Sequence, residues 1–309
     1  MSERVNISFF SPLQDIIKIG IVLTLILAGC VHNIEKGSIK TNVDFSVLVD
    51  GIERTCHLYI PKIYNAQKPV PLVLVFHGYG GNGRRIEEKI TLRKFDKLAE
   101  EHNFIVAYPD GLDKRWRLRP YKNKDIKFIS KLIDKLASTY KIDKIYAVGF
   151  SNGGMFCFLL ACKLSHKISK IATVGASLPK IIYRSCSPSK KVSVIMFHGT
   201  EDRIVRWDGG VGRRKITLLS VEETFNFWKK KNSLYRCSGY QPLPDIYKGD
   251  GTRVYKKECM DKDVKVVLYK IEGGGHTWPG GNSSLPIYIL GRVSRDIDAC
   301  KVICDFFME

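Results

Sequence analysis

Short apolar runs along this chain alternate with longer stretches in which apolar and charged residues recur at helical spacing. Short apolar runs bounded by turn residues are typical of buried strands, whereas the longer stretches are typical of helices that bury one face. We expect strands near Val70, Ile105, Ile145, Ile171, Val192 and Val264, and helices near residues 86–102, 124–140, 152–165, 220–231 and 295–307. This alternation predicts an α/β fold with a mostly parallel sheet covered by helices on both faces.

An antiparallel hairpin is predicted ahead of the first of these strands. Residues 45–49 and 53–60 flank the pair Asp50-Gly51, and Asp-Gly between strands is a strong signal for a two-residue turn. We expect this hairpin to form an edge of the sheet. No linker or repeat divides the remainder, which is long enough for one hydrophobic core, so we expect a single domain over residues 31–309.

One predicted strand-to-helix junction carries a serine. The apolar run that ends at Val148 continues into Gly149-Phe150-Ser151-Asn152-Gly153, and an apolar segment over residues 155–164 follows. In a nucleophile elbow the serine occupies a strained turn between a strand and a helix, and the flanking glycines let the two elements pass closely. An ordinary glycine turn would fit the five residues alone. The strand before and the helix after favour the elbow, with Ser151 as the nucleophile.

A serine nucleophile needs a base to take its proton and a carboxylate to orient that base. In folds with this elbow, the acid and then the histidine follow the serine, each on a loop after a later strand. The strand near Val192 runs into His198-Gly199-Thr200-Glu201-Asp202, and the strand near Val264 leads to a glycine-rich loop that contains His276. We therefore predict Asp202 as the acid and His276 as the base.

Competing interpretations of these residues remain open. An aspartate after a strand is often a turn or cap residue, because its side chain bonds nearby backbone amides. Glu201 is the rival acid. His77 and His198 each precede a glycine at a strand end, and we interpret them as structural residues, one shaping the oxyanion loop and the other the acid loop.

Acyl transfer also needs N–H donors aimed at the developing oxyanion. The amide of Asn152, directly after the serine, is one candidate. The amide of Tyr79 is the second, since the buried run over residues 71–76 leads into His77-Gly78-Tyr79-Gly80-Gly81. A phosphate-binding loop is the alternative, but the stretch lacks the Lys-Ser or Lys-Thr ending that such a loop requires.

With these loops placed, the chain from about residue 54 to its end resembles the polyhydroxybutyrate depolymerase-like and feruloyl esterase group of the α/β-hydrolases. The motifs that carry the resemblance are HGYGG at His77, YPDG at Tyr108 with Trp116 beyond it, GFSNGGM around Ser151, HGTED at His198 and GGGHTWPGG from Gly273. The resemblance implies the α/β-hydrolase fold and a Ser151, Asp202 and His276 triad. A basic stretch over residues 114–127 departs from the group's pattern and leaves the substrate open.

The chain has nine cysteines. The resemblance implies disulfides Cys237–Cys259 and Cys162–Cys186, which spacing alone cannot establish. The first would pin a turn-rich insertion over residues 238–258. We interpret Cys157, Cys300 and Cys304 as buried apolar residues on helices. No paired cysteine spacing of the zinc type occurs, so no metal is expected.

The N-terminal segment predicts export. An apolar run over residues 19–26 is shorter than the roughly 20 residues that a membrane helix needs. It ends in Leu27-Ala28-Gly29-Cys30, and small residues before a cysteine resemble a bacterial lipoprotein signal. We expect residues 1–30 to be a signal peptide that ends at a lipid-modified Cys30, which would anchor the protein to the membrane of the cell envelope. An uncleaved membrane anchor and plain secretion are the alternatives.

The formal net charge is +19, with basic clusters over residues 84–85, 114–119 and 229–231. Charge of one sign attracts anionic surfaces, which for an exported protein are acidic lipids and envelope polymers. The cluster over residues 114–119 could steer an acidic substrate, and a solvated basic face without a partner is an equal alternative. Nucleic-acid binding is not expected, because no recognisable module occurs and the export signal argues against it.

Only a short connection joins the strand near Ile171 to the one near Val192, so we expect no large lid domain. The insertion over residues 238–258 and the loops of Trp116 and Trp278 are predicted to cover the site. At the rim these tryptophans would stack on aromatic or sugar groups, although filling the core is the commoner role of tryptophan. An open site favours a bulky or polymeric ester.

These features predict an exported serine esterase that cleaves carboxylic esters through an acyl-enzyme, without a metal or an organic cofactor. A peptidase or thioesterase on the same triad is the first alternative. The alternative from another class is a catalytically silent, surface-anchored binding protein that keeps the fold.

Overall fold

The computed structural model describes residues 40–212, 215–283 and 286–309. Residues 40–309 form one compact unit. The predicted signal peptide and its Cys30 lie outside the described residues. Within the described ranges, no helix is long and apolar enough to cross a membrane.

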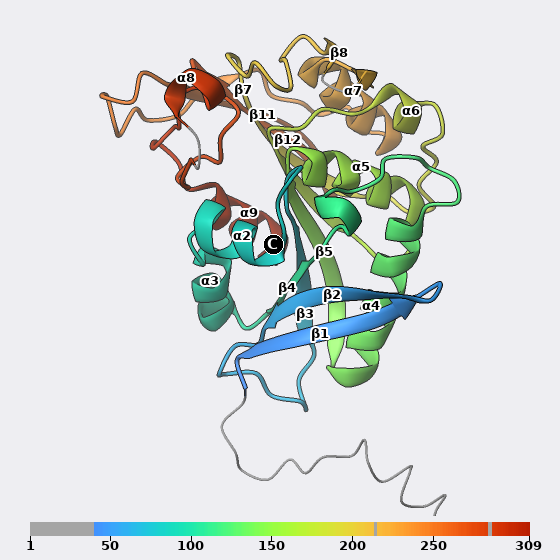
Figure 1. Cartoon of the computed structure of the whole chain (residues 1–309). Coiled ribbons are helices and arrows are strands. Elements are labelled where there is room, and N and C mark those ends of the chain that lie inside the picture. The colour runs from blue at the N-terminus through green and yellow to red at the C-terminus, as the bar shows by residue number, and fades with distance from the viewer. Residues whose placement is uncertain (1–39, 213–214, 284–285) are drawn as a thin grey trace, which may run out of the picture. The chain divides into compact units, whose positions relative to one another are not determined.

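A ten-stranded sheet lies at the centre of this unit (Figure 1). Its order is β1 (Asn42–Val49), β2 (Ile52–Tyr59), β4 (Ile105–Pro109), β3 (Val70–Phe76), β5 (Ile142–Phe150), β6 (Lys170–Val174), β7 (Ser193–Gly199), β12 (Val264–Glu272), β11 (Arg253–Asp261) and β10 (Gln241–Pro242). The strands from β4 to β12 pair in parallel. Both edges of the sheet are antiparallel. The predicted mostly parallel sheet is therefore confirmed.

The predicted hairpin forms one edge of the sheet. Asp50 and Gly51 join β1 to β2 with φ angles of 51° and 77°. A two-residue hairpin turn of type I′ requires positive φ at both positions, which is why Asp-Gly is favoured there. In β1 more exposed and less exposed residues alternate, whereas β7 is buried along its whole length. The continuous apolar runs in the sequence thus belong to strands that are covered on both faces.

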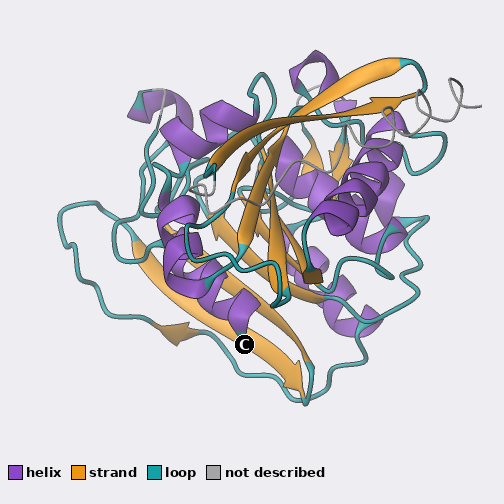
Figure 2. Cartoon of the chain, turned by 90° about the horizontal axis from the view of Figure 1, so that it is seen from below, coloured by secondary structure: helices purple, strands orange, loops and turns teal. Residues whose placement is uncertain are grey.

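Helices cover both faces of the sheet (Figures 1 and 2). On one face, α4 (Lys124–Thr139), α5 (Asn152–Lys163) and α7 (Val221–Lys231) contribute to one apolar core. On the other face, α3 (Lys94–His102) and α9 (Ala299–Met308) contribute to a second core. Asn123, Ser220 and Asp298 accept hydrogen bonds from N–H groups in the first turns of α4, α7 and α9. These caps fix where the three helices begin.

The helix predicted over residues 86–102 is interrupted. The short α2 (Gly83–Arg85) continues into the π-helix η2 (Ile86–Ile90), and α3 follows after a break. Leu92 and Arg93 both have a φ of 56°, which no α-helix accommodates. The Thr91 amide and hydroxyl both donate to the carbonyl of Ile86 at 2.9 Å, which closes the wide turn.

The insertion over residues 238–258 contains strands, whereas the sequence analysis interpreted it as a turn-rich segment. β11 pairs with β12 along its whole length, and the short β10 pairs with β11. β11 buries Val254 and Cys259, while the residues between them are less buried and partly charged. A strand near an edge has one face towards solvent, so it lacks the continuous apolar run that identified the central strands.

The connection between β6 and β7 holds only the short helix α6 (Lys180–Tyr183). No lid domain is inserted at this point of the fold, as predicted. A separate two-stranded sheet of β8 (Gly210–Val211) and β9 (Thr217–Leu218) follows the acid loop instead.

Candidate active site

Ser151 lies on a strained turn between β5 and α5. Its φ and ψ angles are 55° and −117°, a combination that L residues with side chains rarely adopt. The neighbouring glycines make this turn possible. A Cβ atom on Gly149 would lie 2.3 Å from the carbonyl carbon of Gly153, and one on Gly153 would lie 2.3 Å from the carbonyl oxygen of Phe76. The geometry is that of a nucleophile elbow.

Asp202 and His276 are joined by a hydrogen bond. The Nδ1 atom of His276 lies 2.7 Å from Oδ2 of Asp202, and the two residues are 4% and 3% exposed. The other carboxylate oxygen, Oδ1, accepts the N–H groups of Ile204 and Val205, each at 2.8 Å. Burial acts to raise the pKa of Asp202, but the charge of His276 and these hydrogen bonds outweigh it and lower the pKa.

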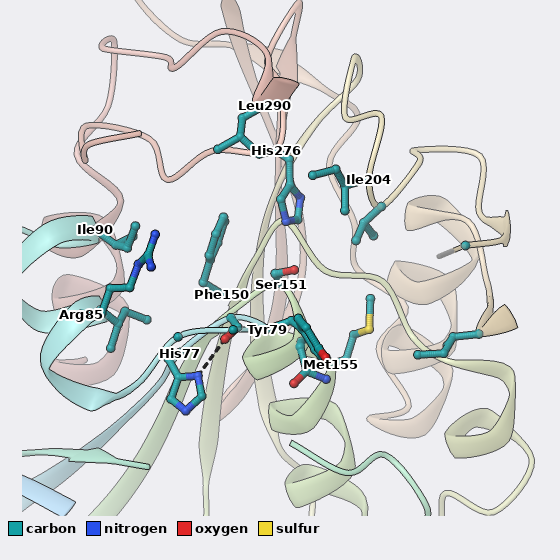
Figure 3. A pocket seen from close by; sticks show the side chains of 18 of the residues that line it. His77, Tyr79, Arg85, Ile90, Phe150, Ser151, Met155, Ile204, His276 and Leu290 are labelled. Atoms are coloured by element: carbon teal, nitrogen blue, oxygen red, sulfur yellow. Dashed lines mark hydrogen bonds between the residues drawn. The ribbon is translucent and has the colours of Figure 1, made fainter. Parts of the chain in front are cut away.

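The rival acid lies elsewhere. The side chain of Glu201 is 56% exposed and pairs with Arg292 at 3.3 Å. The structure therefore brings Asp202, and not Glu201, to His276. Ser151 and His276 line the same cavity, and the imidazole lies over the serine in the view of Figure 3.

The loop that contains Tyr79 is held by a neutral histidine. His77 is 1% exposed, its Nε2 accepts the N–H of Gly111 at 2.9 Å, and its Nδ1 donates to the carbonyl of Gly78 at 2.7 Å. Burial lowers the pKa of His77, in keeping with this neutral tautomer. These contacts agree with the interpretation of His77 as a structural residue that shapes the loop of Tyr79.

His198 is buried next to Asp202 and has a comparable structural role. It is fully enclosed, and its Nε2 donates to the carbonyl of Val205 at 2.7 Å. Burial lowers the pKa of His198. The histidine thus supports the turn whose N–H groups bind Asp202.

Asn152 begins α5 directly after the serine, and its side chain is engaged with the Trp116 loop. The Oδ1 atom accepts the Trp116 N–H at 2.7 Å, and Nδ2 donates to the Trp116 carbonyl at 3.1 Å. Tyr79 and Asn152 both line the cavity. The four predicted loops therefore meet at the carboxyl ends of the parallel strands, where open α/β sheets bind ligands.

The two predicted rim tryptophans are buried, and this prediction was wrong. Trp116 is 2% exposed and Trp278 is 1% exposed. The Trp116 ring stacks on Phe156 with centroids 4.9 Å apart, and its Nε1 donates to the carbonyl of His77 at 3.0 Å. Trp278 packs edge-on against Phe150, whose own ring lies 4.9 Å from that of His276. Each tryptophan packs against another residue of the site, and neither lines the cavity over Ser151.

The cavity over Ser151 has a volume of about 540 Å³. Residues 238–258 do not line it, so the predicted cover is also wrong. The walls come from η2 and its flanks, from α5, from the segment after Asp202, from β9 and from α8 (Ile287–Leu290). The lining side chains that the sequence did not single out are Arg85, Ile86, Ile90, Met155, Ile204, Val205, Ile216, Leu218 and Leu290. Apart from Met155, which ends the GFSNGGM motif, and Arg85, which is part of a basic pair, these positions carry no sequence signal, and only the fold brings them together.

Within the described part of the chain there are two disulfides, Cys162–Cys186 and Cys237–Cys259. They are the pairs that the family resemblance implies. The first ties the end of α5 to the segment after α6, and the second joins the start of the insertion to β11. Among the described residues, Cys56, Cys157, Cys300 and Cys304 are unpaired and buried.

Comparison with known proteins gives a consistent result. Residues 71–191 match the family model described as the alpha/beta hydrolase fold. Feruloyl esterase B of Piromyces equi is 29% identical over 230 residues, which are 70% of this chain and 41% of that protein. Feruloyl esterase D of Neurospora crassa is 24% identical over 74% of this chain and 75% of that protein. The chain thus spans about two fifths of the first relative and three quarters of the second.

A solved structure extends the likeness to the fold. The acetyl xylan esterase from Aspergillus awamori superposes with a TM-score of 0.54 over 76% of this chain and 94% of that one, at 14% identity. The chain therefore has the α/β-hydrolase fold. Its sequence is similar to carboxylic ester hydrolases, the feruloyl esterases among them.

Proposed function

We propose that this chain hydrolyses feruloyl- or acetyl-type carboxylic esters through a Ser151, His276 and Asp202 triad. The observation that carries the proposal is the hydrogen bond of 2.7 Å between His276 Nδ1 and Asp202 Oδ2 beside the strained Ser151. This bond leaves Nε2 of His276 as the atom that takes the serine proton. The charged and buried Asp202 stabilises the imidazolium that forms.

The reaction then has two halves. Ser151 Oγ bonds to the ester carbonyl carbon while His276 takes the hydroxyl proton, and the carbonyl oxygen becomes an oxyanion near the amides of Tyr79 and Asn152. Loss of the alcohol, protonated by His276, leaves an acyl-enzyme. Water attacks this ester by the same route and releases the acid. Each amide donor to the oxyanion contributes about 3 kcal/mol to lowering the barrier.

Export and anchoring are part of the proposal. The two disulfides favour an oxidising compartment, since such bonds persist outside the cytoplasm. We propose that residues 1–30 direct export, that Cys30 is acylated and that residues 31–309 form one catalytic domain. Metabolic labelling with a fatty-acid probe tests the anchor. The Cys30→Ser variant should lose the label, and retention of the label in that variant would reject the anchor.

A fluorophosphonate probe tests the nucleophile. Wild-type protein should be labelled, Ser151→Ala should not, and Ser138→Ala, which changes an exposed serine on α4, should react like wild type. A folded wild type that remains unlabelled would reject the esterase proposal and favour a silent binding protein. Turnover of feruloyl, acetyl and hydroxyalkanoate esters, beside a thioester and a peptide, would then define the acyl group and the bond that is cleaved.

A further inference from the structure

The cavity over Ser151 is lined mainly by apolar side chains, together with polar groups of the loops that carry Tyr79, Ser151 and His276. Among the described residues that line it, Arg85 is the side chain with a permanent charge, and none is Asp or Glu. The other lining side chains include Ile86, Ile90 and Phe150. In the view of Figure 3, Arg85 lies beside Ile90 on one side of Ser151, with Ile204 on the other. A cation in an apolar wall attracts an anion more strongly than it would in open water, because the local dielectric constant is lower.

The backbone that carries Arg85 is firmly held. Its N–H donates to Oδ1 of Asn82 at 2.8 Å, and the N–H of Gly83 donates to Oδ1 of Asp110 at 2.7 Å. A Cβ atom on Gly83 would lie 2.2 Å from the carbonyl oxygen of Tyr108, so only glycine allows α2 to approach β4 this closely. Arg85, directly before the π-helix, lines the cavity together with Ile86 and Ile90 of that helix.

The adjacent arginine points elsewhere. Arg84 pairs with Asp44 at 2.8 Å, near the hairpin of β1 and β2, and it does not line the cavity. Arg85 therefore lines the cavity over Ser151, whereas its neighbour Arg84 does not. This difference provides a matched control for the charge of Arg85.

We propose that Arg85 is a specificity determinant that selects esters carrying a carboxylate in addition to the ester bond. The planar guanidinium binds a carboxylate through two parallel N–H bonds, which gives orientation as well as attraction. The apolar walls contact the hydrocarbon part of the same substrate. The carboxylate belongs either to the acyl group or to the alcohol, and both positions share this chemistry. The inference rests on the proposed esterase function of this cavity.

Two pairs of esters test the proposal. Monoethyl adipate and ethyl hexanoate have the same chain length and differ in a carboxylate on the acyl side. The 4-acetoxybenzoate anion and 4-acetoxybenzamide differ in a carboxylate on the alcohol side. The measured quantity is kcat/KM for the charged ester divided by kcat/KM for its neutral partner, in wild type, Arg85→Gln, Arg85→Lys and Arg84→Gln. Dividing the wild-type ratio by the variant ratio removes the intrinsic reactivity of the esters.

We expect Arg85→Gln to lower this ratio about ten-fold for at least one pair, and Arg85→Lys to lower it by less, because lysine keeps the charge but not the two parallel N–H bonds. Arg84→Gln should leave the ratio unchanged. If the ratio in Arg85→Gln stays within two-fold of wild type for both pairs, and the neutral esters are still hydrolysed, this inference is overturned. The proposed esterase function would then remain intact. Failure of wild type to hydrolyse any of the four esters counts against the proposed function itself.

Discussion

Two regions of this molecule each bury an aspartate, and the two carboxyl groups differ in charge. Asp202 in the acid loop is 3% exposed, and Asp96 on α3 is 5% exposed. The pKa of Asp202 is lowered, whereas burial raises the pKa of Asp96 to about 7. Burial alone therefore does not decide the charge of either group.

Their hydrogen-bond partners explain the difference. Asp202 accepts two backbone N–H groups and lies against His276. Asp96 accepts the hydroxyl of Tyr108 at 2.6 Å and has the buried Glu87 near it, whose charge raises its pKa further. The acid loop supplies donors that stabilise a carboxylate, and the core beneath α3 supplies one neutral hydroxyl. The carboxylate proposed to orient His276 must be charged, so it needs the hydrogen-bond donors that the acid loop supplies.

The largest expected effect is a loss of kcat when Asp202 is replaced. Asp202→Asn should keep the fold but lower kcat by about 10⁴-fold, because the amide holds His276 in the wrong tautomer and cannot stabilise its charged form. Glu201→Gln is the matched control, since Glu201 is exposed and pairs with Arg292. Steady-state kinetics on one ester checks both variants. If Asp202→Asn stayed within ten-fold of wild type, His276 would not depend on this carboxylate.

A smaller effect is expected from Asp96. Its pKa in the folded protein, about 7, lies above the ordinary value of 3.8. The folded state therefore holds a proton that the unfolded state releases, and stability should fall as pH rises from about 4 to about 7. Asp96→Asn keeps the acceptor for Tyr108 but removes the titration. Since one pKa unit corresponds to about 1.4 kcal/mol, the variant should gain a few kcal/mol over wild type at pH 8.

Urea unfolding of wild type and Asp96→Asn at pH 5 and pH 8 measures this difference. The gain should be present at pH 8 and small at pH 5. An equal difference at both pH values would show that Asp96 is already charged in the folded protein.

The smallest expected effect concerns the hydrogen bond that Tyr108 donates to Asp96. Tyr108→Phe removes the hydroxyl that donates to Asp96 and should lower the stability by about 1 kcal/mol at pH 8. The hydrogen bond lowers the pKa of Asp96, so its loss should also move the titration upwards. In the background of Asp96→Asn, the pH-dependent part of this effect should vanish. If Tyr108→Phe kept its full pH-dependent effect on stability in the Asp96→Asn background, that effect would not come from the titration of Asp96.

The sequence predicted the loops that carry the proposed triad because each one follows a strand with a strong local signal. Ser151 is surrounded by glycines that the turn requires, and Asp202 and His276 each come after a buried apolar run. Parallel strands end at the same edge of the sheet, so three local patterns were enough to place three distant residues together.

The walls of the cavity and the tryptophans were not predictable in this way. Trp116 could face substrate or fill the core, and only the packing of Phe76 and Phe156 against it decides for the core. β11 was missed because four partly buried, mostly charged residues separate its buried Val254 and Cys259, so it has no continuous apolar run. Arg85 appeared only as part of a basic pair, and only the folded structure shows that Arg85 lines the cavity while Arg84 pairs with Asp44.

The central claim is that the strained Ser151 becomes the acylated residue during turnover. Acid quenching of wild-type protein during hydrolysis of 4-nitrophenyl acetate, followed by peptide mass spectrometry, tests it most directly. The account predicts an acetyl group on the peptide that contains Ser151, and a loss of both the adduct and the turnover in Ser151→Ala. Turnover that persists in Ser151→Ala, or an acetyl group carried by a different residue during turnover, would contradict it.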